Sequence, residues 1–262
     1  MKFLENIIKK KDPAEFNWWL SNVSDVNALT PNGYTAFDCA IAYGQIEKID
    51  ALLDGGANPN ISSLQNTMTD GTKKWALPFE MMCNRWHDIS HKEKSLAEDV
   101  FVKLVRQISD MNGVLEDGAN ILHKALQYGV PDKVIDAILK LGADVNLSDR
   151  WKVSPLHYAS SLRSVELLIS HGADVNAQDN SGWTALHFAA SRNDTEVARL
   201  LLEAGVDTTL KTTEGETAAE IFNPFCDDEV NDCAELINSY EERQRLEGSV
   251  ASGQKMGRSQ KL

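Results

Sequence analysis

Long apolar runs and ordered cysteine patterns are both missing from this sequence. No stretch of about 18 uncharged apolar residues occurs, so we expect no membrane span. The four cysteines, Cys39, Cys83, Cys226 and Cys233, lack the spacing of a disulfide framework, which favours free thiols in a reducing compartment. Residues 1–16 carry their lysines after a short apolar run, the reverse of a secretory signal peptide. We therefore expect a cytoplasmic protein with no membrane partner.

Positive charge is also scarce, with 26 Lys and Arg against 39 Asp and Glu and a net charge of −13. Binding to a phosphate backbone needs a basic face, so we expect no nucleic-acid partner. A glycine-rich phosphate loop and the GxSxG, HExxH and kinase motifs are all missing. We therefore expect no enzyme, no cofactor and no metal, although catalytic loops without a known motif exist.

One pattern occurs four times, at residues 32–60, 117–146, 154–176 and 180–208. It predicts a capped helix, a short break, a second helix and a turn. In the last copy Thr184 can cap the first helix, and Val197 and Leu201 mark the apolar face of the second. A glycine such as Gly205 then ends the second helix, because it adopts a positive φ at little cost. Such a repeat predicts a stack of helix pairs.

The register of the copies shows one shortened and one enlarged unit. His123, His157 and His187 share a position, at steps of 34 and 30 residues, so the copy at 154–176 has lost about three residues between its helices. From Gly33 to Gly118 there are 85 residues where two regular repeats would take about 66. We expect the roughly twenty extra residues in the hairpin loop at 62–74 and between the helices at 87–94, because insertions collect in surface loops.

The motifs T-A-L-H at 184–187, S-P-L-H at 154–157, I-L-H at 121–123 and G-A-D-V-N at 142–146 and 172–176 resemble the ankyrin repeat. The resemblance implies an all-α solenoid of about six helix-turn-helix units with hairpin loops and an enlarged second repeat. It covers most of residues 1–240. The expected organisation is an ankyrin domain at 1–245, made of a cap at 1–29, repeats at about 30–60, 61–114, 115–148, 149–178 and 179–211, and a C-terminal cap at 212–245. The polar residues 246–262 are expected to be disordered.

Two groups of residues invite a chemical interpretation. The resemblance implies that His123, His157 and His187 hydrogen-bond backbone groups between neighbouring repeats, not that they act in catalysis. Cys83, His87 and His91 are spaced i, i+4, i+8 and would share a face of one continuous helix, where they could hold a metal or form a Cys–His nucleophile. We expect the helix to end near His87, which favours ordinary loop residues. An enzyme or metal protein using the insertion at 61–112 remains the alternative function.

The resemblance places partner binding on the concave surface formed by hairpin tips and first helices. Large aromatics and arginine dominate interface energies. Several such residues fall at groove positions, and those from Trp151 to Arg192 lie on two adjacent repeats. The candidate partner-binding residues are Tyr34, Tyr43, Lys124, Tyr128, Trp151, Tyr158, Trp183, Phe188 and Arg192. We expect a monomeric scaffold that binds a protein or peptide.

The C-terminal segment suggests a biological role. Residues 240–249, followed by a short polar and basic tail, are similar to the glutamate-rich secretion signals of effectors that intracellular bacteria inject into host cells. A solvated acidic helix end has the same composition. An effector secreted into a host cell, where it acts on a host protein, is therefore a hypothesis beside the general scaffold.

Overall fold

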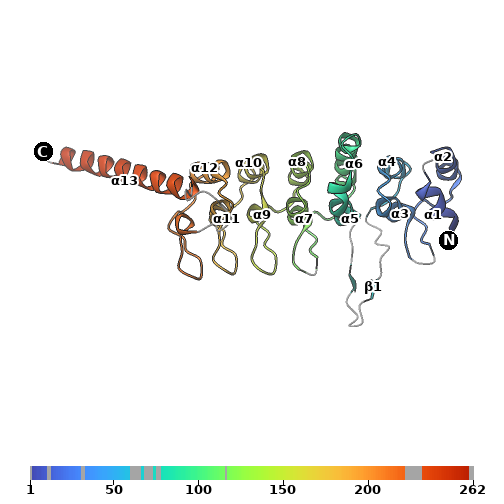
Figure 1. The fold of residues 1–262 in the computed structure, drawn as a ribbon, viewed down its shortest axis with the longest axis horizontal. Helices are drawn as coiled ribbons and strands as arrows, with labels where there is room; N and C mark the ends of the chain where they lie inside the picture. Colours follow the sequence, from blue (N-terminus) through green and yellow to red (C-terminus); the bar gives the residue numbers. More distant parts are fainter. Residues whose placement is uncertain are drawn as a thin grey trace. The chain divides into compact units, whose positions relative to one another are not determined.

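The computed structural model describes residues 2–10, 13–30, 33–59, 66–67, 73–74, 78–115, 117–221 and 232–259. The chain divides into two compact units, Met1–Asp149 and Arg150–Leu262. Regular structure in the described residues is almost entirely helical, which confirms the expected all-α class (Figure 1). None of the helices in this part of the chain is long and apolar enough to cross a membrane.

The first unit stacks helix pairs side by side. The helices α1, α3, α5 and α7 contact one another in succession, and α4, α6 and α8 do the same in a second row. The hairpin loops project on the side of the first row (Figure 1). The pairs are α1 (Lys2–Lys9) with α2 (Pro13–Asn22), α3 (Ala36–Ala42) with α4 (Ile46–Asp54), α5 (Pro78–Arg85) with α6 (Lys94–Val105), and α7 (Ile121–Gln127) with α8 (Asp132–Lys140).

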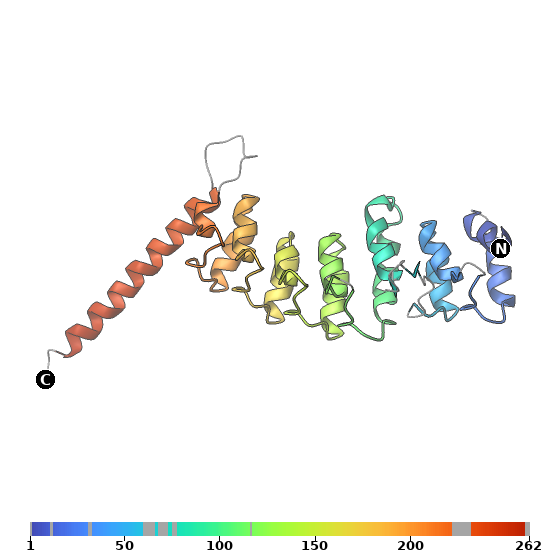
Figure 2. The same cartoon turned by 90° about the horizontal axis from the view of Figure 1, so that it is seen from below.

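The second unit repeats this plan. A first row of α9, α11 and η2 packs in succession, beside a second row of α10, α12 and α13. Figure 2 shows α13 continuing as one straight helix beyond the helices against which it packs. The elements are α9 (Pro155–Tyr158), α10 (Leu162–Ser170), α11 (Ala185–Ser191), α12 (Thr195–Glu203), the 3-10 turn η2 (Ala218–Glu220) and α13 (Asp232–Ser259).

The second-row helices form because their apolar residues recur at helical spacing and face the stack. In α8 of the first unit and in α12 of the second, this face consists of four residues, arranged as two pairs of sequence neighbours. Each of these helices is followed closely by a glycine with positive φ, Gly142 or Gly205. Burial of this face holds each pair to its neighbours. The buried residues are Val134, Ile135, Ile138 and Leu139 in α8 and Val197, Ala198, Leu201 and Leu202 in α12.

The enlarged repeat has its extra residues in the two places expected. In the first place β1 (Asn66–Thr67) pairs antiparallel with β2 (Lys73–Lys74), a short ladder that the sequence did not predict. The other follows α5, where the 3-10 turn η1 (Trp86–Asp88) precedes α6. Trp86 and Phe79 both pack edge-on against Phe101, at 5.6 and 5.8 Å between ring centroids. These aromatic contacts fix the inserted turn to the core.

The C-terminal expectation needs a correction. Residues 246–262 were expected to be disordered, but 246–259 continue α13, and 260–262 lie outside the described residues. The segment contains no proline to break the helix that begins at Asp232, and α13 runs through its glycines. The C-terminal cap expected at 212–245 contains the single turn η2 and the start of α13, and its residues 222–231 lie outside the described part of the chain.

Asparagine side chains join the turns of successive pairs. The Oδ1 atom of Asn112 accepts the backbone N–H of Asp144 at 2.7 Å, and its Nδ2 donates to the carbonyl of Gly142 at 3.2 Å. Asn27 bonds the next turn in the same way, accepting from Asn58 at 2.8 Å and donating to Gly56 at 3.3 Å. The Asp-x-Asn turns expected from the sequence thus also connect neighbouring repeats.

A buried lysine holds the N-terminal pair in place. The ammonium of Lys48 in α4 donates to the carbonyl oxygens of Ile7 at 3.0 Å, Ile8 at 2.6 Å and Lys10, and lies over the ring of Phe16. These carbonyls belong to the end of α1, where a helix leaves acceptors without partners and where its dipole favours a cation. The contact spans about forty residues of sequence.

Replacing Lys48 with methionine should therefore destabilise the N-terminal pair. Lys48→Met leaves buried carbonyls without a donor, which costs about 1–3 kcal/mol. Hydrogen–deuterium exchange should become faster over residues 2–22. The exposed Lys140, which forms an i,i+4 pair with Asp136, provides the control, and Lys140→Met should leave exchange there unchanged. Equal protection in both variants would contradict the proposed role of Lys48.

Candidate partner-binding surface

The recurring histidines are structural, as the resemblance implies. The Nδ1 atom of His187 accepts the backbone N–H of Thr184 at 3.2 Å, so the proton of the neutral ring lies on Nε2, which donates to the carbonyl of Glu216 at 3.3 Å. His157 makes the same contacts, to the N–H of Ser154 at 3.0 Å and to the carbonyl of Trp183 at 3.0 Å. Because both ring nitrogens are occupied, neither histidine has a position free for catalysis.

In two other repeats a carboxylate side chain occupies the position of this histidine. Asp38 accepts the N–H and the hydroxyl of Thr35, both at 2.7 Å, and Glu220 accepts the same two groups of Thr217 at 2.8 and 2.9 Å. Each is a capping box, in which the helix and its cap residue satisfy each other's backbone donors. The backbone N–H bond lowers the pKa of Glu220. A threonine three residues before an acid was the sequence signal for both.

Large aromatic side chains meet on the first row of the second unit. The rings of Trp183 and Phe188 lie 5.0 Å apart between centroids, and Phe188 packs edge-on against His157 at 5.7 Å. Trp151 is 46% exposed, and its carbonyl accepts the N–H of Asn180 at 2.9 Å, which joins two hairpin tips. We call Trp151, Tyr158, Trp183 and Phe188 the aromatic strip.

The backbone that carries Trp183 is fixed from several sides. The carbonyl of Trp183 accepts the bond from His157, and its N–H donates to Asp179 at 2.9 Å. The preceding Gly182 has φ of 76°, and a Cβ there would lie 2.8 Å from the carbonyl oxygen of Lys211. The position therefore requires glycine, and the two hairpins lie close together. These contacts hold the strip in place before any partner binds.

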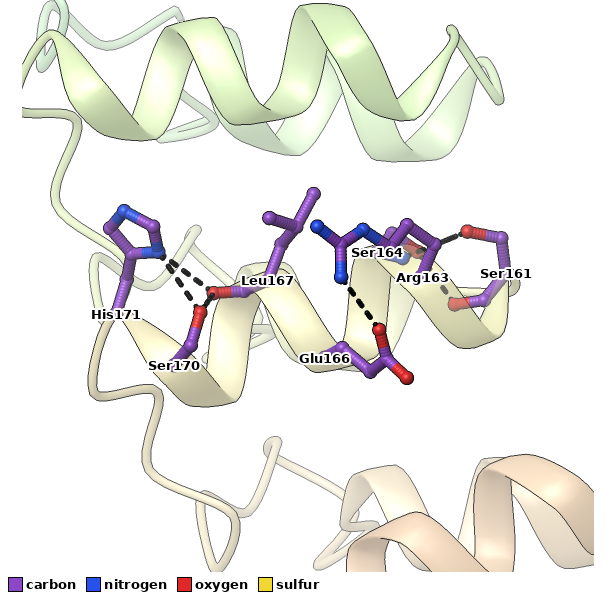
Figure 3. Close-up of polar contacts among 7 residues, drawn as sticks. All are labelled: Ser161, Arg163, Ser164, Glu166, Leu167, Ser170 and His171. Carbon is purple, nitrogen blue, oxygen red and sulfur yellow. Dashed lines mark hydrogen bonds and ion pairs between the residues drawn. The ribbon is translucent and has the colours of Figure 1, made fainter.

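The shortened repeat has a short first helix beside this surface. α9 has only four residues, and the chain reaches Ser161, the cap of α10, two residues after Ala159. Figure 3 shows Ser161 holding the start of α10, where its Oγ accepts the N–H of Ser164 at 2.9 Å. The guanidinium of Arg192 donates to the carbonyl of Ala159 at 3.4 Å. The expected loss of residues between the helices is thus confirmed.

A serine and a histidine lie side by side at the other end of α10 (Figure 3). Ser170 Oγ donates to the carbonyl of Leu167 at 2.8 Å, and Nδ1 of His171 lies 2.9 Å from the same oxygen. Both side chains close the last turn of the helix, where carbonyl acceptors are left over. Their contacts indicate helix capping, not an activated serine.

The candidate partner-binding residues of the first unit are partly buried or already contact other side chains of the protein. Lys124 is only 9% exposed and pairs with Asp117 at 2.9 Å and with Glu80 at 3.9 Å. Burial alone would lower the pKa of Lys124, but the hydrogen bond and charge of Asp117 raise it. Tyr34 is half-buried, and Tyr43 is exposed at the end of α3 with the Lys9 ammonium 5.7 Å from its ring centroid.

Tyr128, the remaining candidate of the first unit, is half-buried at the end of α7. Its carbonyl oxygen accepts from Nε2 of His87 at 3.0 Å.

Cys83, His87 and His91 do not come together as a metal or nucleophile site. Cys83 is fully buried, and burial raises the pKa of its thiol well above the ordinary value. His87 and His91 are exposed. Within the described residues, no three His, Cys, Asp or Glu side chains are grouped so that they could hold a metal ion.

A basic residue that the sequence analysis did not select lies beside the strip. The guanidinium carbon of Arg150 lies 4.1 Å from the ring centroid of Trp151, a cation–π contact at the hairpin tip. Its place next to Trp151 in the sequence was the available signal.

Comparison with known families agrees with this architecture. A model described as "Ankyrin repeats (3 copies)" matches residues 94–179 and 122–212, and one described as "Ankyrin repeat" matches residues 32–61. Together these matches cover more than half of the chain, which therefore belongs to the ankyrin repeat family. Among curated proteins, none matches the sequence.

A solved structure shares the fold. The crystal structure of the ankyrin repeat domain of Bcl-3, described as a unique member of the IkappaB protein family, is similar with a TM-score of 0.60 and 21% identity. The alignment covers 90% of this chain and 97% of that one. At this identity the similarity shows the fold alone.

The buried His187 should make the second unit less stable in acid. Burial lowers the pKa of His187, although the Glu216 carbonyl and nearby Asp179 oppose this. Between the folded pKa and the ordinary value near 6.5, the unfolded chain binds the proton more readily, so stability falls as the pH falls through this range. The thermal midpoint should be lower at pH 5.5 than at pH 7.5.

A pair of variants isolates this contribution. His187→Gln should reduce the pH dependence, whereas His171→Gln at the exposed end of α10 should keep it. If His187→Gln shows the same dependence as the unaltered chain, proton uptake at His187 does not cause it.

Proposed function

We propose that this chain binds a protein or peptide through the concave face of its repeats, with the aromatic strip of the second unit as the main contact. The observation that carries the proposal is the contact of Trp183 with Phe188 at 5.0 Å, beside the 46% exposed Trp151. Exposed clusters of large apolar groups commonly mark interaction sites, and tryptophan and arginine are enriched among the residues that dominate binding energy.

The mechanism that we propose is rigid presentation. Hydrogen bonds from His157 and to Asp179 hold the backbone of Trp183, and the Asn180 bond to Trp151 joins the two tips. Side chains that are ordered before binding lose less conformational entropy when the partner arrives. The candidates of the first unit, Tyr34, Tyr43, Lys124 and Tyr128, are proposed as secondary contacts.

We further propose a non-enzymatic, monomeric, cytoplasmic scaffold. The ankyrin repeat is typically a protein-binding fold. The two repeat histidines use both ring nitrogens in the fold, and the buried Cys83 thiol has a raised pKa, which disfavours the reactive thiolate. No observation favours the enzyme or metal protein that the insertion at 61–112 suggested.

Truncating the strip should abolish partner binding without unfolding the chain. The test variant carries Trp151→Ala, Tyr158→Ala, Trp183→Ala and Phe188→Ala. An affinity pull-down from eukaryotic lysate, read by mass spectrometry, should lose the proteins retained by the unaltered chain, because each large anchor contributes on the order of 2 kcal/mol to binding.

The control is Trp18→Ala, which removes a 63% exposed tryptophan from α2, outside the strip. Circular dichroism must show that both variants remain helical. Retention of the same proteins by the quadruple variant would move the binding site away from the strip.

We also propose that the chain is an effector secreted into a host cell through its C-terminal segment. Glu242, Arg243 and Glu247 are exposed on α13, as a segment read by a secretion machinery requires. Deletion of residues 241–262 should abolish translocation of a reporter fusion into host cells. The quadruple strip variant keeps the C-terminal segment and should still be translocated. Undiminished translocation of the deletion variant would refute this role.

A further inference from the structure

The groove side of the second unit carries positive charge in a strongly acidic chain. Arg150 and Lys152 are exposed at one hairpin tip, and Arg192 is exposed at the far end of α11. None of the three forms an ion pair with any carboxylate in the described residues. Arg192 uses one weak bond to the Ala159 carbonyl, and Arg150 lies over Trp151, so their charge remains available.

Each of the two hairpin tips carries one acid, Asp149 directly before Arg150 in the sequence and Asp179 on the next hairpin. Asp149 is buried. Asp179 accepts the backbone N–H of Ser181 at 2.8 Å and that of Trp183 at 2.9 Å through one carboxylate oxygen. The next hairpin carries Glu214 and Glu216 beside a single lysine, Lys211, so its charge is not basic. Positive charge and aromatic surface thus occur at the same place.

Lys152 occupies a position that otherwise belongs to glycine. Two residues before the helix cap, four other hairpins in the described part of the chain carry Gly33, Gly118, Gly182 and Gly215, all with positive φ. Lys152 has φ of 59° at this position. An L-residue with a long side chain is strained there, and glycine would relieve the strain. Strain kept at an exposed position points to a function for the side chain.

We propose that the occupant of this surface is an acidic peptide segment whose carboxylates flank an aromatic or large aliphatic side chain. This inference rests on the proposed function and specifies its partner. The apolar side chain packs on Trp183 and Phe188, while carboxylates pair with Arg150 and Lys152 at the tip and with Arg192 at the end of α11. Arg192 follows Phe188 by four residues on α11, so the two share a face. Arginine can bind a carboxylate with two parallel hydrogen bonds.

Selection from a random 12-residue peptide display library on the full chain tests this proposal. Peptides retained by the unaltered chain should be enriched in Asp and Glu around an aromatic or aliphatic residue. A fluorescein-labelled copy of the most enriched peptide is then titrated by fluorescence anisotropy. Replacing its acids with Gln and Asn should weaken binding about tenfold or more, and raising NaCl from 50 to 300 mM should weaken the acidic form preferentially.

The variants locate the charges. Arg150→Glu, Lys152→Glu and Arg192→Glu together should weaken the labelled peptide at least tenfold. The control, Lys92→Glu, Arg106→Glu and Arg199→Glu, makes the same change in net charge at exposed positions outside the strip and should stay within about twofold, because distant charges are screened. Equal weakening by both triple variants would overturn the proposal.

Lys152→Gly separates binding from folding. Glycine relieves the positive-φ strain, so the thermal midpoint of the variant should rise while the acidic peptide binds several-fold more weakly. A variant that is less stable, or that binds the peptide as tightly as the unaltered chain, would show that Lys152 is not kept for this role.

The remaining outcomes distinguish the two levels of the proposal. Selected peptides that lose binding in Trp183→Ala, Phe188→Ala but show no acidic enrichment would overturn the acidic partner and leave groove binding intact. Failure to select any peptide above the level of that double variant would overturn both. Binding of a labelled 15-nucleotide oligouridylate, lost in the triple variant of Arg150, Lys152 and Arg192, would assign the surface to nucleic acid instead.

Discussion

Stacking in the second unit includes a hydrogen bond that leaves one repeat and ends on the backbone of the next. An imidazole can do this because it accepts at one nitrogen and donates at the other, so a single buried side chain caps its own helix and holds the neighbouring hairpin. His157 and His187 perform both tasks in the second unit. Asp38 and Glu220 provide only acceptors, so they cap their own helices and cannot donate to another backbone.

The same hydrogen bond connects the fold with the binding surface. The acceptor of His157 is the carbonyl of Trp183, one of the two tryptophans of the aromatic strip. The backbone of the strip is therefore part of the stacking network, not a loop laid over it. A surface built in this way can vary its side chains while its backbone positions stay fixed, which agrees with a fold that serves many partners.

The features that the sequence predicted correctly are those determined by interactions between residues close in the sequence. Capping residues, helix-ending glycines and apolar spacing depend on neighbours within a few positions, and the repeats, the shortened α9 and the two insertion sites followed from them. The Lys48 contact with the end of α1 joins residues about forty apart and leaves no periodic trace. The continuation of α13 was not predicted because the polar, glycine-containing composition favoured a coil, although the segment contains no proline.

The candidate binding surface was likewise predicted only in part. Aromatic groove positions could be transferred from the repeat register, and Trp183 with Phe188 lie together as that register implies. The register does not reveal which charges are already paired. Lys124 occupies a groove position yet is buried against Asp117. Arg150, which was not among the candidates from the sequence, lies against Trp151. Whether a charged side chain is paired depends on residues from several hairpins, so it cannot be predicted from the repeat register alone.

The buried ammonium of Lys48 also sets a lower limit on the folded unit. Its acceptors are main-chain carbonyls at the end of α1, so they vanish together if the chain is shortened from its N-terminal side past Lys10. A truncated chain would then hold a cation against Phe16 and the exposed flank of α4 with no acceptor for its protons. The first helix pair is thus not a dispensable extension, because α4 depends on it for the partners of a buried charge as well as for apolar packing.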